Sequence, residues 1–154
     1  VISPDGKTLI VANAGSYKAY VMRISATGGL TEMESLQLPT KNGQSCVFSP
    51  DGTKAYYYSN SNLGKFPIHV LDITAPGKAA YHSSIEMSIP RGTSQLFGVD
   101  TLAIDPSGQY LFVSNPTVSG GVVEVTVINL ATQTETAQLH CNGIPTGIAF
   151  ATIE

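Results

Sequence analysis

The chain has 154 residues, a formal net charge of −3 and a pI near 5.5. Hydrophobic residues make up 42% of it and charged residues 12%, which excludes a disordered chain and is enough for a buried core. The sequence has no cluster of Lys and Arg for a nucleic-acid partner, and no apolar run long enough to span a membrane.

A four-residue motif recurs along the chain and marks a repeat. It reads Ser3-Pro4-Asp5-Gly6, then Ser49-Pro50-Asp51-Gly52 and, in a looser form, Asp105-Pro106-Ser107-Gly108. Its prolines are 46 and 56 residues apart, the length of one small antiparallel sheet. Proline presets φ, Asp caps its own backbone and Gly accepts a positive φ, so each motif predicts a hairpin turn. This geometric role is favoured over a metal or catalytic role for Asp5 and Asp51.

Runs of β-branched and aromatic residues surround each turn and predict four strands per repeat. The first repeat has the end of a first strand at Val1-Ile2, followed by strands at 8–12, 20–24 and 30–38. The second repeat has strands at 44–48, 55–59, 69–73 and 79–89. The third has them at 100–104, 110–114, 126–130 and 134–140, and residues 146–150 copy the first strand once more.

Four antiparallel strands per repeat, with no amphipathic helical stretch, are typical of a propeller blade. We therefore predict an all-β chain that forms a β-propeller segment of about three four-stranded antiparallel blades, part of a ring of about six to eight. The predicted blades are residues 1–46, 47–102 with an inserted loop at 89–99, and 103–147. Residues 146–154 hold the first strand of the next blade.

Three stretches of the third repeat resemble the YVTN-type propeller repeat, which grades into the lactonase-like propellers and the propeller parts of quinoprotein dehydrogenases. They are Tyr110 to Asn115, Val125 to Thr132 and Gly143 to Phe150. The second repeat departs from the pattern, with Ser59 where the others have Asn13 and Asn115. The resemblance implies the fold. It leaves the activity open, because this group includes enzymes, electron-transfer subunits and surface proteins.

Three repeats are too few to close a ring, since propellers have about 4–8 blades. Two interpretations follow: the chain is a fragment of a longer polypeptide, or several copies build the ring. In the second, residues 146–150 of one subunit supply the first strand beside residues 8–12 of the next. The predicted partners are thus other blades of the same protein, or neighbouring subunits, paired through strands at both chain ends. A protein partner or a small ligand is also considered for the loop face.

Ligands of a propeller usually bind where the first strands line the channel and loops gather on one face. Aligning the repeats places Gln44, Asp100 and Thr146 at one level near the start of the first strand. The ligand-binding candidates at this channel mouth are Gln44, Asp100, Thr146, Arg91, Asn142 and Lys65. The alternatives are structural: Asp100 as a turn cap, Arg91 as a solvated loop charge and Asn142-Gly143 as a tight turn.

The spacing of His and Cys residues provides no ligand set for zinc or covalent haem, so neither a metal nor a cofactor is predicted. The sequence also lacks a Gly-x-Ser-x-Gly elbow, and no catalytic residue is assigned. His69 is interpreted as an ordinary side chain of a sheet. For the two cysteines, a buried thiol at Cys46 and a loop thiol at Cys141 are favoured over a disulfide.

These observations favour a non-catalytic propeller scaffold or binding module of a larger secreted, periplasmic or cell-surface protein. Low charge and loops rich in Ser, Thr and Asn point in this direction. The alternative is an enzyme: a lactonase-like hydrolase, or the propeller subunit of a quinoprotein-type redox enzyme.

Overall fold

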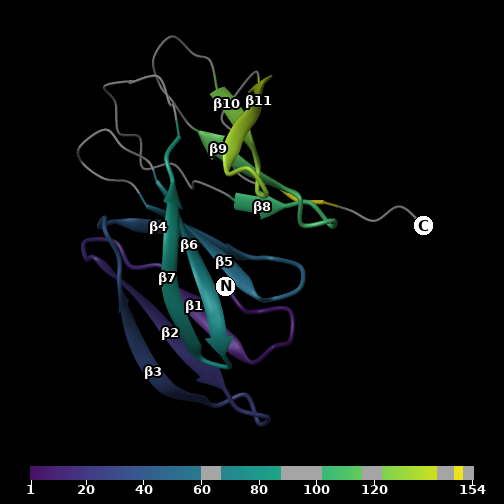
Figure 1. Ribbon diagram of the computed structural model, residues 1–154. Coiled ribbons are helices and arrows are strands. Elements are labelled where there is room, and N and C mark those ends of the chain that lie inside the picture. Colours follow the sequence, from purple (N-terminus) through teal and green to yellow (C-terminus); the bar gives the residue numbers. More distant parts are fainter. Residues whose placement is uncertain (60–66, 88–101, 116–122, 142–147, 151–154) are drawn as a thin grey trace. The chain divides into compact units, whose positions relative to one another are not determined.

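The computed structural model describes residues 1–59, 67–87, 102–115, 123–141 and 148–150, and all regular structure in them is β-strand (Figure 1). The chain divides into two compact units, Val1–Glu86 and Met87–Glu154. The strands of the first unit are β1 (Thr8–Val11), β2 (Lys18–Ile24), β3 (Leu30–Gln37), β4 (Gly43–Phe48), β5 (Lys54–Ser59), β6 (Ile68–Ala75) and β7 (Lys78–Ile85). Those of the second unit are β8 (Leu102–Ile104), β9 (Tyr110–Asn115), β10 (Val123–Asn129) and β11 (Thr134–Cys141). No helix long and apolar enough to cross a bilayer occurs in the described residues.

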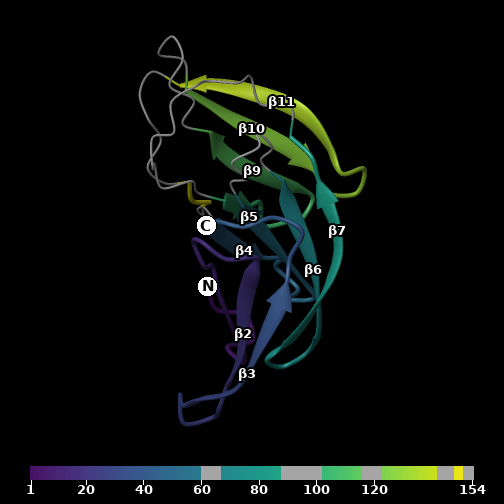
Figure 2. The same cartoon turned by 90° about the vertical axis from the view of Figure 1, so that its left-hand side faces the viewer.

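The strands form three antiparallel sheets in which neighbours in sequence are neighbours in space. The first sheet has the order β1-β2-β3, the second β4-β5-β6-β7, and the third β8-β9-β10-β11. In Figure 2, strands β9, β10 and β11 of the third sheet lie side by side. A short fourth segment extends the first sheet: Ile2 bridges Leu9, and the Ile10 N–H donates to the Val1 carbonyl at 2.9 Å. The second and third sheets are the four-stranded meanders that the repeat predicts, and the first is a three-stranded meander with this bridge at its edge.

The predicted blade boundaries can be compared with these sheets. The boundary between residues 46 and 47 runs through β4, whose residues Gly43 to Phe48 pair with β5. The boundary between residues 102 and 103 runs through β8, which pairs with β9. In hydrogen-bonded terms each sheet therefore begins with the strand that precedes its turn motif. The inserted loop at 89–99 lies outside the described residues.

The strand predicted at residues 146–150 is not formed in the part that the structure describes. Residues 148–150, the end of the predicted strand 146–150, have no strand pairing in the described part of the second unit. Phe150 instead packs its ring against Phe112 of β9, with ring centroids 5.0 Å apart. A strand forms only with a hydrogen-bonded neighbour, and no strand of the described residues pairs with residues 148–150.

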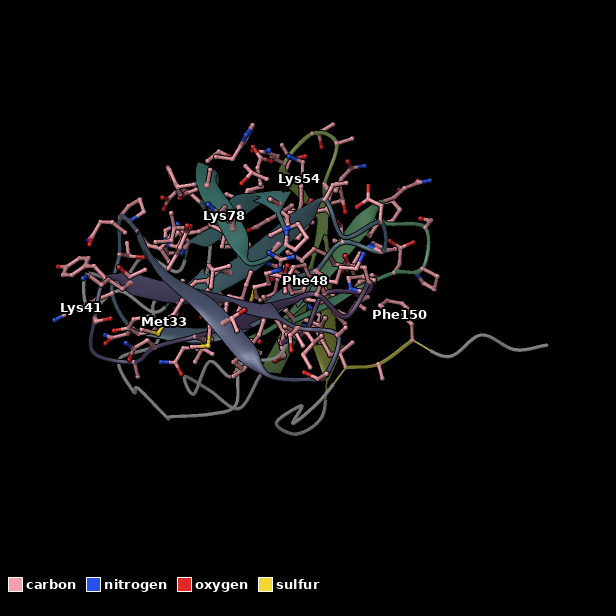
Figure 3. The ribbon with its side chains drawn as sticks, turned by 90° about the horizontal axis from the view of Figure 1, so that it is seen from below. Met33, Lys41, Phe48, Lys54, Lys78 and Phe150 are labelled. Atoms are coloured by element: carbon pink, nitrogen blue, oxygen red, sulfur yellow. The ribbon has the colours of Figure 1, made fainter. Side chains whose placement is uncertain are left out.

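The core of the first unit lies between the first and second sheets, which face each other (Figure 1). Alternation along each strand turns Ile10, Ala19 and Val21 of the first sheet toward the second. The second sheet contributes Phe48, Ala55, Tyr57 and Leu71, with Phe48 visible inside the unit in Figure 3. Lys78 of β7 and Glu34 of β3 close the rim of this interface with an exposed ion pair at 3.5 Å.

The turn motifs adopt the predicted geometry. In the second turn, Gly52 has φ +71° and its N–H donates to the Ser49 carbonyl at 2.9 Å. The Asp51 carboxylate accepts hydrogen bonds from the Ser49 hydroxyl at 2.6 Å and from the Thr53 N–H at 3.0 Å. These bonds, the one from Ser49 foremost, hold the pKa of Asp51 below its usual value. The structural role predicted for Asp51, and for Asp5 in the equivalent first turn, is confirmed.

The third turn reaches the same network with two residues exchanged. Asp105 takes the place of the first serine and accepts the Tyr110 N–H at 2.7 Å, as the Ser3 hydroxyl accepts the Thr8 N–H at 2.9 Å. Ser107 takes the place of the aspartate and donates its hydroxyl to Asp105. Hydroxyl and carboxylate have swapped positions, yet the bond between them is retained.

Asp51→Ala is expected to lower the melting temperature by about 3 °C, because it removes the acceptor for Ser49 and Thr53 on an exposed hairpin. Thermal unfolding followed by circular dichroism measures the change. Lys41→Ala, a half-buried residue outside the turn, serves as the control. A melting temperature equal to that of the wild type would contradict the capping role.

Candidate functional site

The second sheet brings the predicted channel-mouth position and a buried polar cluster to the same edge. Because its strands are antiparallel, the start of β4, the end of β5, the start of β6 and the end of β7 all lie at this edge. The pairing Gly43↔Ser59 joins β4 to β5, and Ile68↔Ile85 joins β6 to β7. The connection from β3 to β4, which includes Thr40, reaches the same edge. This end of the second sheet, where the strand ends meet, is the candidate site and is called its edge below.

Gln44 is the predicted site residue that the structure describes. It lies on β4, one residue from the strand start, and its side chain is exposed. The other five candidates, Asp100, Thr146, Arg91, Asn142 and Lys65, lie outside the described residues. Their convergence with Gln44 therefore stays a prediction.

His69 on β6 is the centre of a hydroxyl cluster just inside this edge. Its Nε2 lies 2.7 Å from Thr40 Oγ1 and 3.0 Å from Ser59 Oγ, and these two hydroxyls also bond to each other. Its Nδ1 lies 2.8 Å from Ser84 Oγ on β7. Ser84 Oγ lies 3.0 Å from the phenol oxygen of Tyr81, whose ring meets the imidazole edge to face. One imidazole thus joins β5, β6, β7 and the connection between the sheets.

The cluster is built for structure rather than proton transfer. His69 and Ser59 are both 0% exposed, so neither is accessible to a substrate. Burial lowers the pKa of His69 to about 4, because desolvation disfavours the charged imidazolium. The neutral ring can donate from one nitrogen and accept at the other, and hydroxyls can serve both roles. His69 joins the strand ends at the same edge of the sheet as Gln44.

Tyr57 on β5 connects the same edge of the second sheet to Asn13, which follows β1 of the first sheet. Its phenol oxygen accepts the Asn13 N–H at 3.0 Å, and the Gly43 N–H donates to the Asn13 carbonyl at 3.1 Å. Gly43 lies so close to this phenol that a Cβ on it would be 1.8 Å from the Tyr57 oxygen. The start of β4, and with it Gln44, is therefore positioned by a glycine-specific contact.

A second polar cluster lies toward the other end of the second sheet. Asp72 of β6 accepts a hydrogen bond from Lys54 Nζ at 2.6 Å and lies 2.9 Å from Nδ1 of His82. The bond from Lys54, ahead of the contact with His82, holds the pKa of Asp72 below its usual value. Figure 3 labels Lys54 at the outside of the unit. With its oxygens already paired, Asp72 is an ion-pair partner rather than a base.

Cys46 on β4 is a free, half-buried thiol packed against the core cluster. Burial raises its pKa to about 12, so the thiol stays protonated and unreactive near neutral pH. Cys46 is thus a free thiol, as predicted, although it is half-buried rather than fully buried. Among the described residues, no group of three or more His, Cys, Asp or Glu side chains could hold a metal ion.

Alignment of the repeats places His69 level with Tyr20 and Thr126, which favours an ordinary sheet residue and does not indicate the cluster. A signal was present in the sequence: the repeat with His69 is also the one with Ser59 instead of Asn. Two departures in the same repeat, on neighbouring strands, indicate a paired replacement. The hydroxyls of Thr40 and Ser84 gave no such signal.

No protein-family model matches the chain, and no curated protein matches it by sequence. Several solved structures do match it. A candidate 6-phosphogluconolactonase from Bacteroides uniformis matches 98% of this chain and 43% of its own, with 18% identity and a TM-score of 0.66. A second one, from Bacteroides fragilis, matches 92% of this chain and 38% of its own, with 18% identity and a TM-score of 0.63.

A third structural match is the periplasmic gluconolactonase of Pseudomonas aeruginosa. It covers 94% of this chain and 41% of its own length, with 18% identity and a TM-score of 0.64. The chain thus spans about two fifths of the length of these proteins. Its three sheets and these matches together show an all-β chain with the fold of a β-propeller segment, of the kind found in lactonase-like propellers.

Proposed function

We propose that this chain is part of a lactonase-like β-propeller that hydrolyses the ring ester of a sugar lactone. The observation that carries the proposal is the match of more than nine tenths of the chain to three propellers described as gluconolactonases or candidate 6-phosphogluconolactonases. The described edge of the second sheet fits this proposal, since it exposes Gln44 on a rigid support. A buried cluster that locks the strand start is what a positioned binding group needs.

The chemistry requires few groups. Lactone hydrolysis adds water to a carbonyl that is already in a ring ester, so it needs a donor to the carbonyl oxygen and a base for the water. The Gln44 amide is proposed as the donor. Asp100, at the same repeat level, is proposed as the base, and Arg91 as a second charge near the substrate.

The test is hydrolysis of glucono-δ-lactone, followed by proton release against a buffer blank. Asp100→Asn is expected to lower kcat/KM by about 100-fold or more, since it removes a base of this type. Gln44→Ala is expected to lower kcat by about tenfold to 100-fold through loss of one donor.

Gln37→Ala is the matched control, an exposed glutamine of the first sheet that has no proposed role in binding or catalysis. Its kcat/KM is expected to equal that of the wild type. Hydrolysis no faster than the buffer blank, or an equal loss in the Gln37 control, would contradict the proposal.

A binding or scaffolding module is the second candidate function. It is favoured by the state of the described ionisable side chains: Asp51 and Asp105 hold turns, Asp72 is paired, and His69 is sealed. For the compartment we propose secreted, periplasmic or cell-surface, supported by the periplasmic gluconolactonase among the structural matches.

A further inference from the structure

Asn42 and Gly43, where the β3–β4 connection enters β4, bring an electrophile and a nucleophile together in one short stretch of chain. The Cγ of an Asn side-chain amide can be attacked by the backbone nitrogen of the next residue, and a glycine there places no Cβ beside that nitrogen. The attack is intramolecular, so it needs a rotation of the side chain rather than a collision between two molecules. Asn is accordingly a thermolabile residue in proteins.

The reaction balances with water as the sole co-reactant. The Gly43 nitrogen forms a bond to Asn42 Cγ, the bond from Cγ to Nδ2 breaks, and Nδ2 leaves as ammonia with the proton of the Gly43 N–H. The product is a five-membered cyclic imide. Water opens this ring at either carbonyl and gives Asp or an isoaspartyl linkage, in which the backbone runs through the former side-chain atoms Cβ and Cγ.

The fold occupies both reacting groups. The Gly43 N–H donates to the Asn13 carbonyl at 3.1 Å, so its proton is held in a hydrogen bond. Asn42 Oδ1 accepts the Gly15 N–H at 2.9 Å, which holds the side-chain amide against the connection between β1 and β2. Attack therefore requires that the amide leave Gly15 and that the Gly43 N–H leave Asn13.

This protection depends on the hydrogen bonds that fix the edge of the second sheet. Asn13 is held through its N–H by the Tyr57 phenol at 3.0 Å. Thr40, in the same connection as Asn42, is held by Nε2 of His69 at 2.7 Å. Folded proteins open locally at a fraction of the free energy of complete unfolding. Opening of this edge therefore decides when the Asn-Gly pair can react.

We propose that Asn42 is a self-modification site gated by this edge: the imide forms when the β3–β4 connection opens, and the isoaspartyl product prevents it from closing again. The isoaspartyl linkage lengthens the backbone before Gly43 and adds a free carboxylate. Gly43 has no room for such a shift, since even a Cβ on it would lie 1.8 Å from the Tyr57 oxygen. The modification therefore permanently loosens the strand start that carries Gln44.

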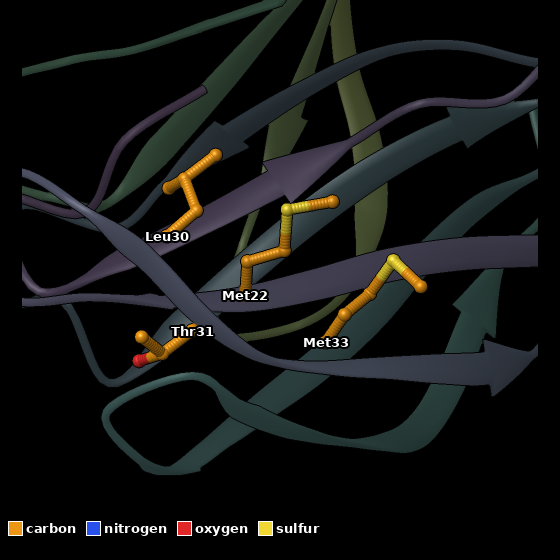
Figure 4. A pocket seen from close by; sticks show the side chains of 4 residues that line it. All are labelled: Met22, Leu30, Thr31 and Met33. Carbon is orange, nitrogen blue, oxygen red and sulfur yellow. The ribbon is translucent and has the colours of Figure 1, made fainter.

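Two methionines of the first sheet illustrate the contrast with an ungated site. Met22 and Met33 lie beside a hollow of about 290 Å³ (Figure 4), and Met33 is 65% exposed. Their thioethers change only when an external oxidant reaches them. Asn42 and Gly43 carry both reacting groups themselves, so the conformation of the edge controls their reaction.

Peptide mapping by mass spectrometry measures the modification, because an amide becomes an acid, and fragment ions distinguish the isoaspartyl linkage from Asp. At neutral pH, Asn42 is expected to react at least about tenfold more slowly in the folded chain than in the chain unfolded by guanidinium chloride. Asn42→Gln should abolish the product, because the longer side chain no longer forms the five-membered ring.

Tyr57→Phe opens the edge from the side of the first sheet. It removes the acceptor of the Asn13 N–H, and loss of one hydrogen bond is expected to raise the rate at Asn42 about fivefold through a larger open population. Tyr56→Phe is the matched control, because alternation along β5 places Tyr56 on the other face of the sheet. Its rate should equal that of the wild type.

Thr40→Val opens the edge from the connection itself, so the test does not depend on one variant. It removes the hydroxyl that bonds to His69 and Ser59, and it should also raise the rate at Asn42 about fivefold or more. Asp51→Ala is the control for general destabilisation. It weakens the turn at the other end of the second sheet and should leave the rate at Asn42 unchanged.

Circular dichroism first establishes that every variant is folded. Equal rates at Asn42 in the folded and unfolded chain would overturn the proposal, as would folded Tyr57→Phe and Thr40→Val chains that react like the wild type. A rise in Asp51→Ala as large as that in Tyr57→Phe would also overturn it, because the reaction would then proceed through complete unfolding. The measurement uses no lactone, so its outcome is separate from that of the hydrolysis assay.

Discussion

Gly43→Ala is expected to lower the free energy of unfolding by about 3 kcal/mol, because the new methyl group overlaps a buried phenol. Its Cβ would lie 1.8 Å from the Tyr57 oxygen and 2.4 Å from the ring carbon that bears it. Tyr57 is 1% exposed and cannot swing into solvent without leaving the core. Urea unfolding monitored by circular dichroism measures the loss.

Two variants test the cause of this loss. Gly29→Ala is the control, since its Cβ would meet only the Ser25 hydroxyl, at 3.2 Å, and should change stability little. Tyr57→Phe removes the nearest overlapping atom but leaves the ring carbon at 2.4 Å, so Gly43→Ala should be less harmful in that background without becoming harmless. If the two substitutions were additive, the close contact would not be the source of the effect.

Stability is expected to fall by about 2 kcal/mol between pH 7 and pH 5 through the titration of His69. The pKa of His69 is about 4 in the folded chain, against 6.5 for an ordinary histidine. Between these two values the unfolded chain binds a proton that the folded chain refuses, so stability decreases as the pH falls. Above pH 6.5 the contribution of His69 is complete, and below pH 4 no more of it is lost.

Urea midpoints at pH 7, 6 and 5 measure this slope. His69→Phe, which keeps a ring in the site but cannot bind a proton, should be less stable at pH 7 and should lose most of the pH dependence. His82→Gln removes the exposed histidine beside Asp72 and should retain it. An unchanged slope in His69→Phe would show that another group titrates in this range.

Much of the strand arrangement could be predicted because it depends on local signals. The turn at Ser49 to Gly52 fixes where β4 ends and β5 begins, and the aromatic run of β5 follows at once. The prediction for β9, residues 110–114, differs from the structure by a single residue. The prediction for residues 146–150 failed for the described residues 148–150, because a strand needs a partner edge as well as a suitable composition.

The candidate site was less predictable, because it depends on contacts between distant parts of the chain. His69 meets Thr40, 29 residues away, and Ser84, 15 residues away. The Asn13–Tyr57 bond joins residues 44 positions apart. Repeat alignment identifies equivalent positions within blades, so it placed Gln44 at the sheet edge. It carries no information on a cluster that occurs in one repeat alone.

The exchanged serine and aspartate of the third turn bear on how such turns can be altered. Replacing Asp105 alone by Ser would put two hydroxyls where the chain now has a hydroxyl and a carboxylate, and replacing Ser107 alone by Asp would oppose two negative charges. The viable unit of change is the pair. Protein engineers who transplant hairpins among these repeats should therefore move both side chains in one step, and ancestral sequences joining the two arrangements should pass through a weakened intermediate.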